Sequence, residues 1–228
     1  MDMKAILKEK KLTALYQPIY MLKNKEIYGY EGLSRVNASG VSNIMDVIEF
    51  AEKTNKVQEL DLLMMEEVIR SFKGKGILFV NMMVKNLEET QEYLEKMVKV
   101  AGEANVFLEN IIIELSERKG WDLSSLNLIK EFRKKYKFRL AIDDFGSGFA
   151  NCRLLLVAHP DIVKIDRAIV MKVHESREKQ IIIRGFIRML KEIGIEVLCE
   201  GIEERIELEL LEDFGSDYGQ GYYLGRPA

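Results

Sequence analysis

The sequence predicts an α/β fold, a modified (β/α)8 barrel of the TIM type. Short runs rich in β-branched and aromatic residues alternate with longer segments of helical periodicity along most of the chain. This alternation is typical of a parallel sheet with crossover helices, and roughly eight strands favour a closed barrel over an open sheet. Only the polar turn 23–25 separates the first two strands. We therefore expect one antiparallel strand in an opening hairpin.

The expected elements follow one another without a clear break. The strands are expected at 14–22, 26–33, 76–81, 110–115, 138–143, 161–166, 195–200 and, for a short last one, near 217–225. The helices are expected at 42–54, 57–72, 87–103, 123–136, 177–193 and 204–214. No linker or low-complexity stretch interrupts them, so we expect a single domain over residues 1–228, with its core at about 12–227.

Composition and charge exclude several classes of protein. The 34 Lys and Arg residues nearly balance the 37 Asp and Glu residues, giving a net charge of -3. We expect no DNA or RNA duplex as a partner, because such a chain has no general attraction for a phosphate backbone. The charged N-terminus lacks the apolar core of a signal peptide, and no apolar run is long enough to cross a bilayer. We expect a cytoplasmic protein with no membrane segment in this chain.

Histidine and cysteine form no recognisable site. His159 and His174 are the only histidines, which excludes a multi-histidine metal site. Cys152 and Cys199 lie far apart, in neither metal-ligand nor redox spacing. Base and metal chemistry must therefore come from other residue types.

Polar residues stand at the C-terminal end of one predicted strand after another. They are Glu31, Asn81, Glu114, Asp143 with Asp144, Lys164 with Asp166, Glu200 and Gln220. These ends converge in a barrel, although any single carboxylate there can equally be the cap of the following helix. Gathered carboxylates raise one another's pKa unless a cation neutralises them, so the pattern predicts a metal site. Oxygen ligands favour Mg²⁺ or Mn²⁺ over Zn²⁺, and Ca²⁺ stays open as an inhibitory occupant.

The adjacent acids Asp143 and Asp144 carry the most specific signal. One bridging carboxylate and its neighbour can hold two ions about 3.5–4 Å apart, the spacing used in phosphoester cleavage. The alternative is an Asp-rich turn before the glycine loop 146–148. Lys164 could orient a water molecule or offset phosphate charge, although a lysine at a strand end more often reaches into solvent.

A set of motifs between Tyr16 and Pro227 resembles the EAL domain family of cyclic di-GMP phosphodiesterases. The motifs are YQPI (16–19), YEGLSR (30–35), VNMM (80–83), ELSE (114–117), DDFGSG (143–148), KID (164–166), CEGIE (199–203) and YGQGYYLGRP (218–227). Their order and spacing together are highly specific. The chain departs from the family pattern at Gly32, where alanine is usual, and at 82–83 and 149–152.

The resemblance implies a role for each matching residue. Glu31, Asn81, Glu114 and Asp143 would bind the first metal, with Asp144 and Asp166 at or near the second. The catalytic residues would be Glu31, Lys164, which positions the water, and Glu200, a general base or metal-linked acid. Gln17, Arg35 and Gln220 would contact substrate, with Arg35 offering a planar fork to a phosphate. Glu117 and Glu203 would be supporting acids for the loops.

The implied reaction is attack by metal-activated water on one phosphodiester of cyclic di-GMP, giving linear pGpG, in an enzyme that forms a homodimer. Three alternatives stay open. The chain could be an inactive cyclic di-GMP receptor or protein-interaction module, since filled ligand positions do not guarantee a productive geometry. It could be another enzyme on the same barrel, such as a lyase with Lys164 as base. The apolar stripes of its helices could instead form an interaction scaffold, although such stripes usually face a barrel core.

Overall fold

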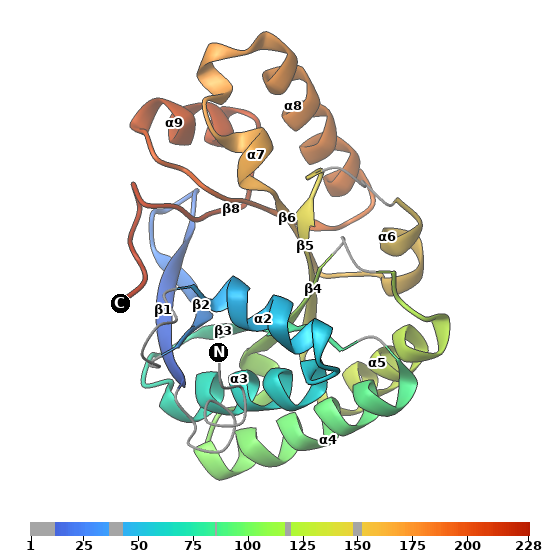
Figure 1. The fold of residues 1–228 in the computed structure, drawn as a ribbon. Coiled ribbons are helices and arrows are strands. Elements are labelled where there is room, and N and C mark those ends of the chain that lie inside the picture. The colour runs from blue at the N-terminus through green and yellow to red at the C-terminus, as the bar shows by residue number, and fades with distance from the viewer. Residues whose placement is uncertain (1–11, 37–42, 85, 117–119, 148–151) are drawn as a thin grey trace.

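In the computed structural model, residues 12–36, 43–84, 86–116, 120–147 and 152–228 are described. Strands in this part of the chain close into an eight-stranded barrel whose order follows the sequence (Figure 1). They are β1 (Leu12–Met21), β2 (Ile27–Val36), β3 (Ile77–Met82), β4 (Ile111–Ser116), β5 (Arg139–Phe145), β6 (Ile162–Ile165), β7 (Glu196–Cys199) and β8 (Tyr218–Gly219). The predicted barrel class is confirmed.

The first strand runs against its neighbours. β1 pairs antiparallel with both β2 and β8, whereas the other pairs around the barrel are parallel. The turn that reverses the chain is short: the backbone N–H of Lys25 donates to the carbonyl of Met21 at 2.9 Å, and Lys25 adopts a left-handed φ of 63°. The hairpin expected at residues 23–25 is confirmed, and it makes β1 the single antiparallel strand.

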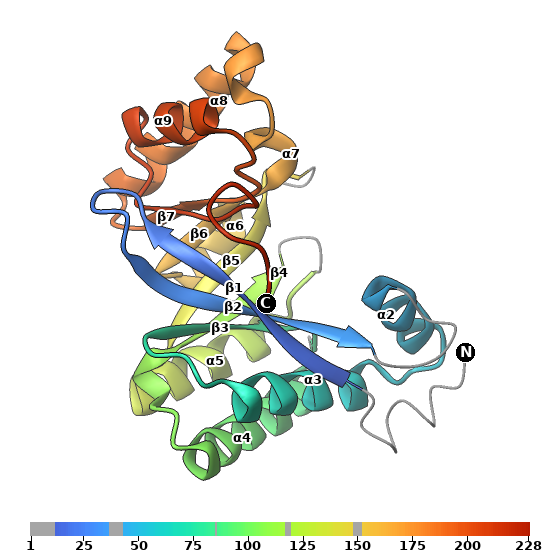
Figure 2. The same ribbon diagram turned by 90° about the vertical axis from the view of Figure 1, so that its left-hand side faces the viewer.

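Helices cover the outside of the barrel. They are α2 (Ile44–Lys53), α3 (Val57–Ser71), α4 (Leu87–Ala104), α5 (Leu123–Tyr136), α6 (Cys152–Ala158), α7 (Arg167–Val170), α8 (Arg177–Glu192) and α9 (Arg205–Asp213), with 3-10 turns η1 (Leu108–Asn110) and η2 (Val173–Glu175). Figures 1 and 2 show α3, α4 and α5 beside β2 to β5, and α7, α8 and α9 grouped beside β6 and β7. The sequence missed α6 and α7, because one or two turns show no helical period.

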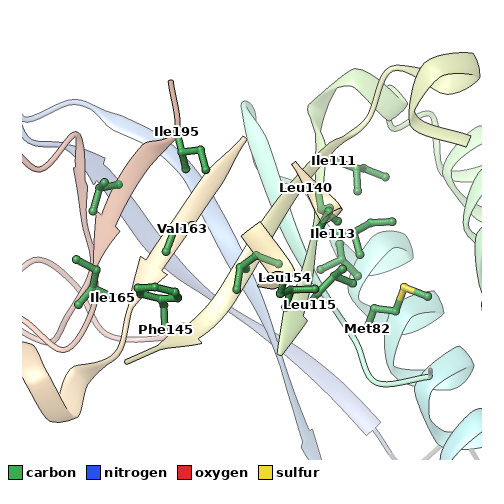
Figure 3. Close-up of a cluster of buried hydrophobic side chains, with 14 of the residues drawn as sticks. Met82, Ile111, Ile113, Leu115, Leu140, Phe145, Leu154, Val163, Ile165 and Ile195 are labelled. Atoms are coloured by element: carbon green, nitrogen blue, oxygen red, sulfur yellow. The ribbon is translucent and has the colours of Figure 1, made fainter. Parts of the chain in front are cut away.

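Two hydrophobic clusters hold the barrel together. The larger one lies between the sheet and the helices, and Figure 3 shows part of it, including Ile113, Leu115, Phe145 and Leu154. The smaller one consists of Ile19, Phe79, Ile112, Ala141, Ile162, Leu198 and Tyr218, on β1 and β3 to β8. Burial on both faces explains why these strands read as continuous apolar runs.

Candidate functional site at the mouth of the barrel

Strand alternation places the polar residues above the smaller cluster. Successive side chains point to opposite faces of a strand, so residues two apart share a face. The polar residues Asn81, Glu114, Asp143, Lys164, Glu200 and Gln220 each follow a member of that cluster by two positions. Gln17 precedes Ile19 by two, because β1 runs in the opposite direction. The same period that packs the barrel interior therefore sets a polar layer at its C-terminal mouth.

Glu31 reaches this layer from the middle of a strand. β2 continues to Val36, so the expectation that Glu31 ends its strand is wrong. Pairing of β2 with β3, however, ends at the pair of Glu31 with Phe79. Beyond this point β2 stays paired only with β1, which explains why the strand outlasts the barrel wall. Glu31 still lies at the C-terminal end of the closed barrel.

Lys164 lies at the centre of the acidic residues. Its ammonium Nζ is 2.6 Å from Glu114 Oε1, 2.8 Å from Glu200 Oε1, 3.0 Å from Asp143 Oδ1 and 3.6 Å from Glu31 Oε1. The side chains of Lys164 and Glu114 are both 0% exposed. The alternative in which this lysine reaches into solvent is therefore wrong: carboxylates from β2, β4, β5 and the residue after β7 surround one buried ammonium.

The charges in this cluster do not balance. Burial raises the pKa of Glu114 well above its usual range, and the charges of Glu31 and Asp143 add to the shift. Burial likewise raises the pKa of Glu200 to about 8, although Lys164 opposes the shift. Burial alone would lower the pKa of Lys164, but the surrounding carboxylates outweigh it and raise that pKa. One ammonium does not neutralise four carboxylates, so the cluster has room for further positive charge.

Two amide side chains complete the layer. Gln220 Nε2 donates to Glu31 Oε2 at 2.6 Å, and Asn81 Nδ2 lies 3.5 Å from Glu31 Oε1. Within the described ranges, the buried oxygens Glu114 Oε2 and Gln220 Oε1 have no hydrogen-bond partner. Such buried acceptors are costly unless a cation or water satisfies them. The donor set therefore fits a hard divalent ion such as Mg²⁺ or Mn²⁺.

The structure does not present a finished metal cage. Among the described residues, no group of three or more acidic, histidine or cysteine side chains is arranged to hold an ion. The carboxylate oxygens are instead drawn toward the ammonium of Lys164. Binding of an ion would therefore require these side chains to turn.

The Asp pair lies on a local irregularity of its strand. The pairing of β5 with β6 shifts register between Ile142 and Phe145, so that Asp143 and Asp144 stand opposite Lys164 alone. Asp144 adopts a left-handed φ of 60°, and the Ser116 hydroxyl lies 3.5 Å from its Oδ2. A bulge of this kind breaks the alternation of side chains, so that neighbouring residues need not point to opposite faces. The alternative of a simple turn is only partly right, because the turn starts inside the strand.

Asp166 is occupied as a helix cap. Its Oδ1 accepts a hydrogen bond at 2.7 Å from the backbone N–H of Ala168, in the first turn of α7. Capping was the alternative that we left open for any carboxylate at a strand end. The assignment of Asp166 to a second ion stays a prediction.

The expected substrate-contacting residues lie on both sides of Glu31. Gln17, with Nε2 3.0 Å from the carbonyl of Gly225, lines a polar cavity of about 200 Å³ with Gln220. Arg35, with Nη1 3.0 Å from the carbonyl of Ser34, lines a second cavity of about 200 Å³, whose apolar lining comes mostly from α2 and α3. Glu31 lines both cavities, so a ligand that bridges them would pass over the acidic cluster.

The two supporting acids have different outcomes. Glu203 lies at the rim of the polar cavity, where its Oε1 accepts a hydrogen bond from Nη2 of Arg167 at 2.6 Å. It has no described contact with Lys164. Glu117 lies outside the described residues, as do Gly148 and residues 149–151 of the segment that departs from the family pattern.

Two residues that hold the end of β3 were not singled out from the sequence. Asp61, buried on α3, accepts hydrogen bonds from the backbone N–H groups of Met83 at 2.8 Å and Val84 at 3.0 Å. Tyr93, buried on α4, donates its hydroxyl hydrogen to the carbonyl of Asn81 at 2.8 Å. The available signal was an acid on the apolar face of a predicted helix, since Asp61 follows Leu60 there.

The fold and the site together define a class: a TIM-like barrel that gathers carboxylates and a buried lysine at the C-terminal mouth, where enzymes of this fold carry their active sites. Within the described ranges, every helix is too short or too polar to span a bilayer. The chain belongs to the EAL domain family, whose model matches residues 2–227.

Curated relatives share this domain at low identity. The chain is 29% identical over 220 residues to a probable cyclic di-GMP phosphodiesterase, PdeA of Escherichia coli K12, covering 92% of this chain and 30% of PdeA. It is 26% identical over 241 residues to the cyclic di-GMP phosphodiesterase NbdA of Pseudomonas aeruginosa, covering 99% of this chain and 30% of NbdA. The chain thus spans about 30% of the length of these relatives.

Solved structures share the fold. A standalone EAL protein from Vibrio cholerae O395, in its c-di-GMP-bound form, superposes with a TM-score of 0.84 at 27% identity, over 95% of this chain and 92% of that one. Klebsiella pneumoniae BlrP1, in a complex with calcium and cyclic di-GMP, superposes with a TM-score of 0.77 at 25% identity, over 96% of this chain and 56% of that one.

Proposed function

We propose that this protein is a metal-dependent phosphodiesterase that hydrolyses cyclic di-GMP to linear pGpG. The observation that carries the proposal is the cluster of four carboxylates around buried Lys164, at the mouth of an EAL barrel. Relatives named as cyclic di-GMP phosphodiesterases, and related structures bound to that ligand, support the choice of substrate.

The metal would be held by oxygen ligands. Glu31, Asn81, Glu114 and Asp143 would hold one ion, and Asp144 and Asp166 are the candidates for a second. When bound, Mg²⁺ or Mn²⁺ would lower the pKa of a water molecule and neutralise charge on the phosphate. The excess of carboxylates over ammonium groups is the physical reason for a cation here.

The remaining steps fall to the protein's own side chains. Lys164 holds the carboxylates in one layer and offers an ammonium to the water or to a phosphate oxygen. Glu200, 2.8 Å from Lys164, would accept the proton of the attacking water. The oxygen of that water would bond to phosphorus as the bond from phosphorus to the ribose 3′ oxygen breaks. The departing 3′ oxygen would take up a proton, either the one that Glu200 accepted or one from solvent water, to leave a hydroxyl group, and the ring opens. Gln17, Arg35 and Gln220 would orient the dinucleotide across the two cavities.

One observation favours a second candidate, a receptor that binds cyclic di-GMP without turnover. In the described part of the chain the carboxylates contact Lys164 and form no ready metal cage. If that arrangement persists, ligand would bind over a site that cannot load its ions. The two candidates share a ligand and differ in whether a product forms.

The test is to incubate the purified protein with cyclic di-GMP and Mg²⁺ or Mn²⁺ and to separate the nucleotides by chromatography. We expect pGpG with the wild-type protein and a loss of rate of at least about 100-fold with Asp143→Asn, because one ligand carboxylate is removed. The matched control is Asp213→Asn, whose side chain is 72% exposed on α9. Saturable binding without pGpG would favour the receptor, and neither binding nor product would overturn both.

A further inference from the structure

Arg167 lines the polar cavity at the barrel mouth, and none of the roles above uses it. It is the first residue of α7, directly after Asp166, and its side chain is 57% exposed. Glu203 and Tyr222 line the same cavity of about 200 Å³, together with Gln17 and Gln220. The cavity therefore has a guanidinium and a carboxylate in its wall, in addition to the residues assigned to substrate.

The side chain of Arg167 contacts the protein at two places, along its stem and at its guanidinium. A Cβ atom on Gly201 would lie 2.1 Å from its Cγ and 2.8 Å from its Cδ, so the aliphatic stem passes over a position that only glycine can fill. Gly201 also has a left-handed φ of 72°. The guanidinium Nη2 donates to Glu203 Oε1 at 2.6 Å. A group fixed at stem and head is preorganised for recognition.

The pair matches one purine and mismatches the other. Guanine presents two neighbouring acceptors, O6 and N7, which suit the fork of an arginine, and beside them two donors, N1–H and N2–H₂, which suit a carboxylate. Adenine presents a donor at position 6 and an acceptor at N1, so the arginine would face another donor and the carboxylate would face another acceptor. A guanidinium has five N–H donors, enough to hold Glu203 and a base together.

We propose that Arg167 and Glu203 form a base-reading pair that selects guanine in the polar cavity, with Arg167 donating to O6 and N7 and Glu203 accepting from N1–H and N2–H₂. The inference rests on the proposed function for its ligand. It makes Arg167 a specificity residue and gives Glu203 a role at the base, away from the loop contacts expected from the sequence.

The lining of the second cavity supports the assignment of base reading to the polar cavity. It contains Arg35 and mostly apolar residues. Among the described residues that line this cavity, the one carboxylate is that of Glu31, which belongs to both cavities. An arginine beside apolar walls can bind a phosphate or stack on a base, and the other polar side chains of this lining, Ser34 and Asn81, offer no carboxylate to match the two donors of a guanine. Selection between guanine and adenine therefore falls to the polar side.

The test compares Arg167→Ala with the matched control Arg205→Ala, which removes an exposed arginine from α9 that contacts Glu209 at 2.7 Å and lies outside the cavity lining. Binding of cyclic di-GMP and cyclic di-AMP is measured by calorimetry with Ca²⁺, and KM and kcat with Mg²⁺. We expect Arg167→Ala to lower the preference for guanine by about 5- to 150-fold, mostly through KM and Kd. Arg205→Ala should change neither preference nor KM.

Two further variants decide whether the base is read. Arg167→Lys keeps the charge but loses the fork, so we expect the preference for guanine to fall as it does with Ala. Glu203→Gln adds a donor that fits adenine N1, so it should strengthen binding of cyclic di-AMP relative to cyclic di-GMP. Full recovery by Lys would overturn the proposal and indicate a phosphate contact. If the wild-type protein binds cyclic di-GMP and Arg167→Ala keeps the same preference for guanine, the base-reading proposal is overturned and the proposed function stands. If the wild-type protein binds neither cyclic dinucleotide, the proposed function is overturned as well.

Discussion

Lys164 shows how strongly context decides the role of one side chain. A lysine at a strand end usually extends into water, where its ammonium is solvated. Here its position two residues after Ile162 points it into the barrel, where Glu114, Asp143 and Glu200 lie within 3.0 Å of its Nζ. The ammonium stays charged because these carboxylates outweigh the cost of burial. An unpaired lysine at this position would destabilise the barrel.

Gly32 is the departure from the family pattern that the structure explains best. A Cβ at this position would lie 2.2 Å from Cγ1 of Val68, a buried residue of α3. Val68 thus occupies the space that a methyl group at position 32 would need, across the interface between β2 and α3. Close packing against Val68 therefore explains the glycine beside Glu31.

Gly32→Ala should destabilise the protein by about 1–3 kcal/mol, because the new methyl group overpacks the contact with Val68. In a Val68→Ala background the same substitution should cost much less, so the double-mutant cycle should be non-additive. Urea unfolding of the four proteins measures this. Gly102→Ala, where a Cβ would meet no atom within 4 Å, is the matched control and should be neutral or slightly stabilising. Additive effects of the Gly32 and Val68 substitutions would contradict the packing explanation.

At the scale of elements, the end of β3 is held by α3 and α4, the helices that precede and follow it in the chain. Asp61 on α3 accepts the N–H groups of Met83 and Val84, and Tyr93 on α4 fixes the carbonyl of Asn81. The strand end that presents Asn81 is therefore tied to the outer layer rather than left as a free loop. Positioning of an expected ligand depends on packing between helices and sheet.

Tyr93→Phe should weaken Mn²⁺ binding several-fold and reduce stability by about 1 kcal/mol, because it removes the hydrogen bond to the carbonyl of Asn81. Calorimetric titration with Mn²⁺ and urea unfolding measure the two effects. Tyr136→Phe, on the outer helix α5, is the control and should leave Mn²⁺ binding unchanged. An equal loss of stability with unchanged Mn²⁺ binding would show that Tyr93 stabilises the fold without positioning Asn81.

At the scale of the whole molecule, the acidic mouth couples stability to pH and metal. The pKa of Glu200 rises from a usual 4.5 to about 8, and that of Glu114 is raised as well. A raised carboxyl pKa means that the folded state binds more protons than the unfolded state within that window, so stability falls as pH rises through it. Lys164, whose pKa is raised from 10.5, stays protonated there and adds no slope.

Metal-free protein should therefore lose about 1–3 kcal/mol of stability between pH 6 and pH 8.5, relative to a Glu200→Gln variant, which lacks the titrating carboxyl. Added Mg²⁺ should restore most of the loss at pH 8.5, because it neutralises the carboxylates and binds only the folded state. Urea unfolding at both pH values, with and without Mg²⁺, measures this. The same slope in wild type and variant would place the titration elsewhere.

The sequence by itself determined the barrel and the residues at its mouth. Alternating strands and helices predicted the closed barrel, and the short turn at 23–25 predicted the antiparallel strand; both follow from local periodicity and loop length. The polar residues after the apolar strand positions could be identified for the same reason. The predicted helix ends lie within a few residues of the observed ones, because the side chains of residues such as Asn86 and Ser176 cap the helices there.

Only the tertiary structure decided which of those residues meet. In the structure Lys164 lies among four carboxylates, Asp166 caps α7, and Glu203 accepts a hydrogen bond from Arg167. These outcomes depend on strand register, on a bulge at Asp143 and Asp144, and on a side-chain stem passing over Gly201. The contacts of Lys164 and of Glu203 join residues far apart in the chain, and no local pattern contains the distances between them.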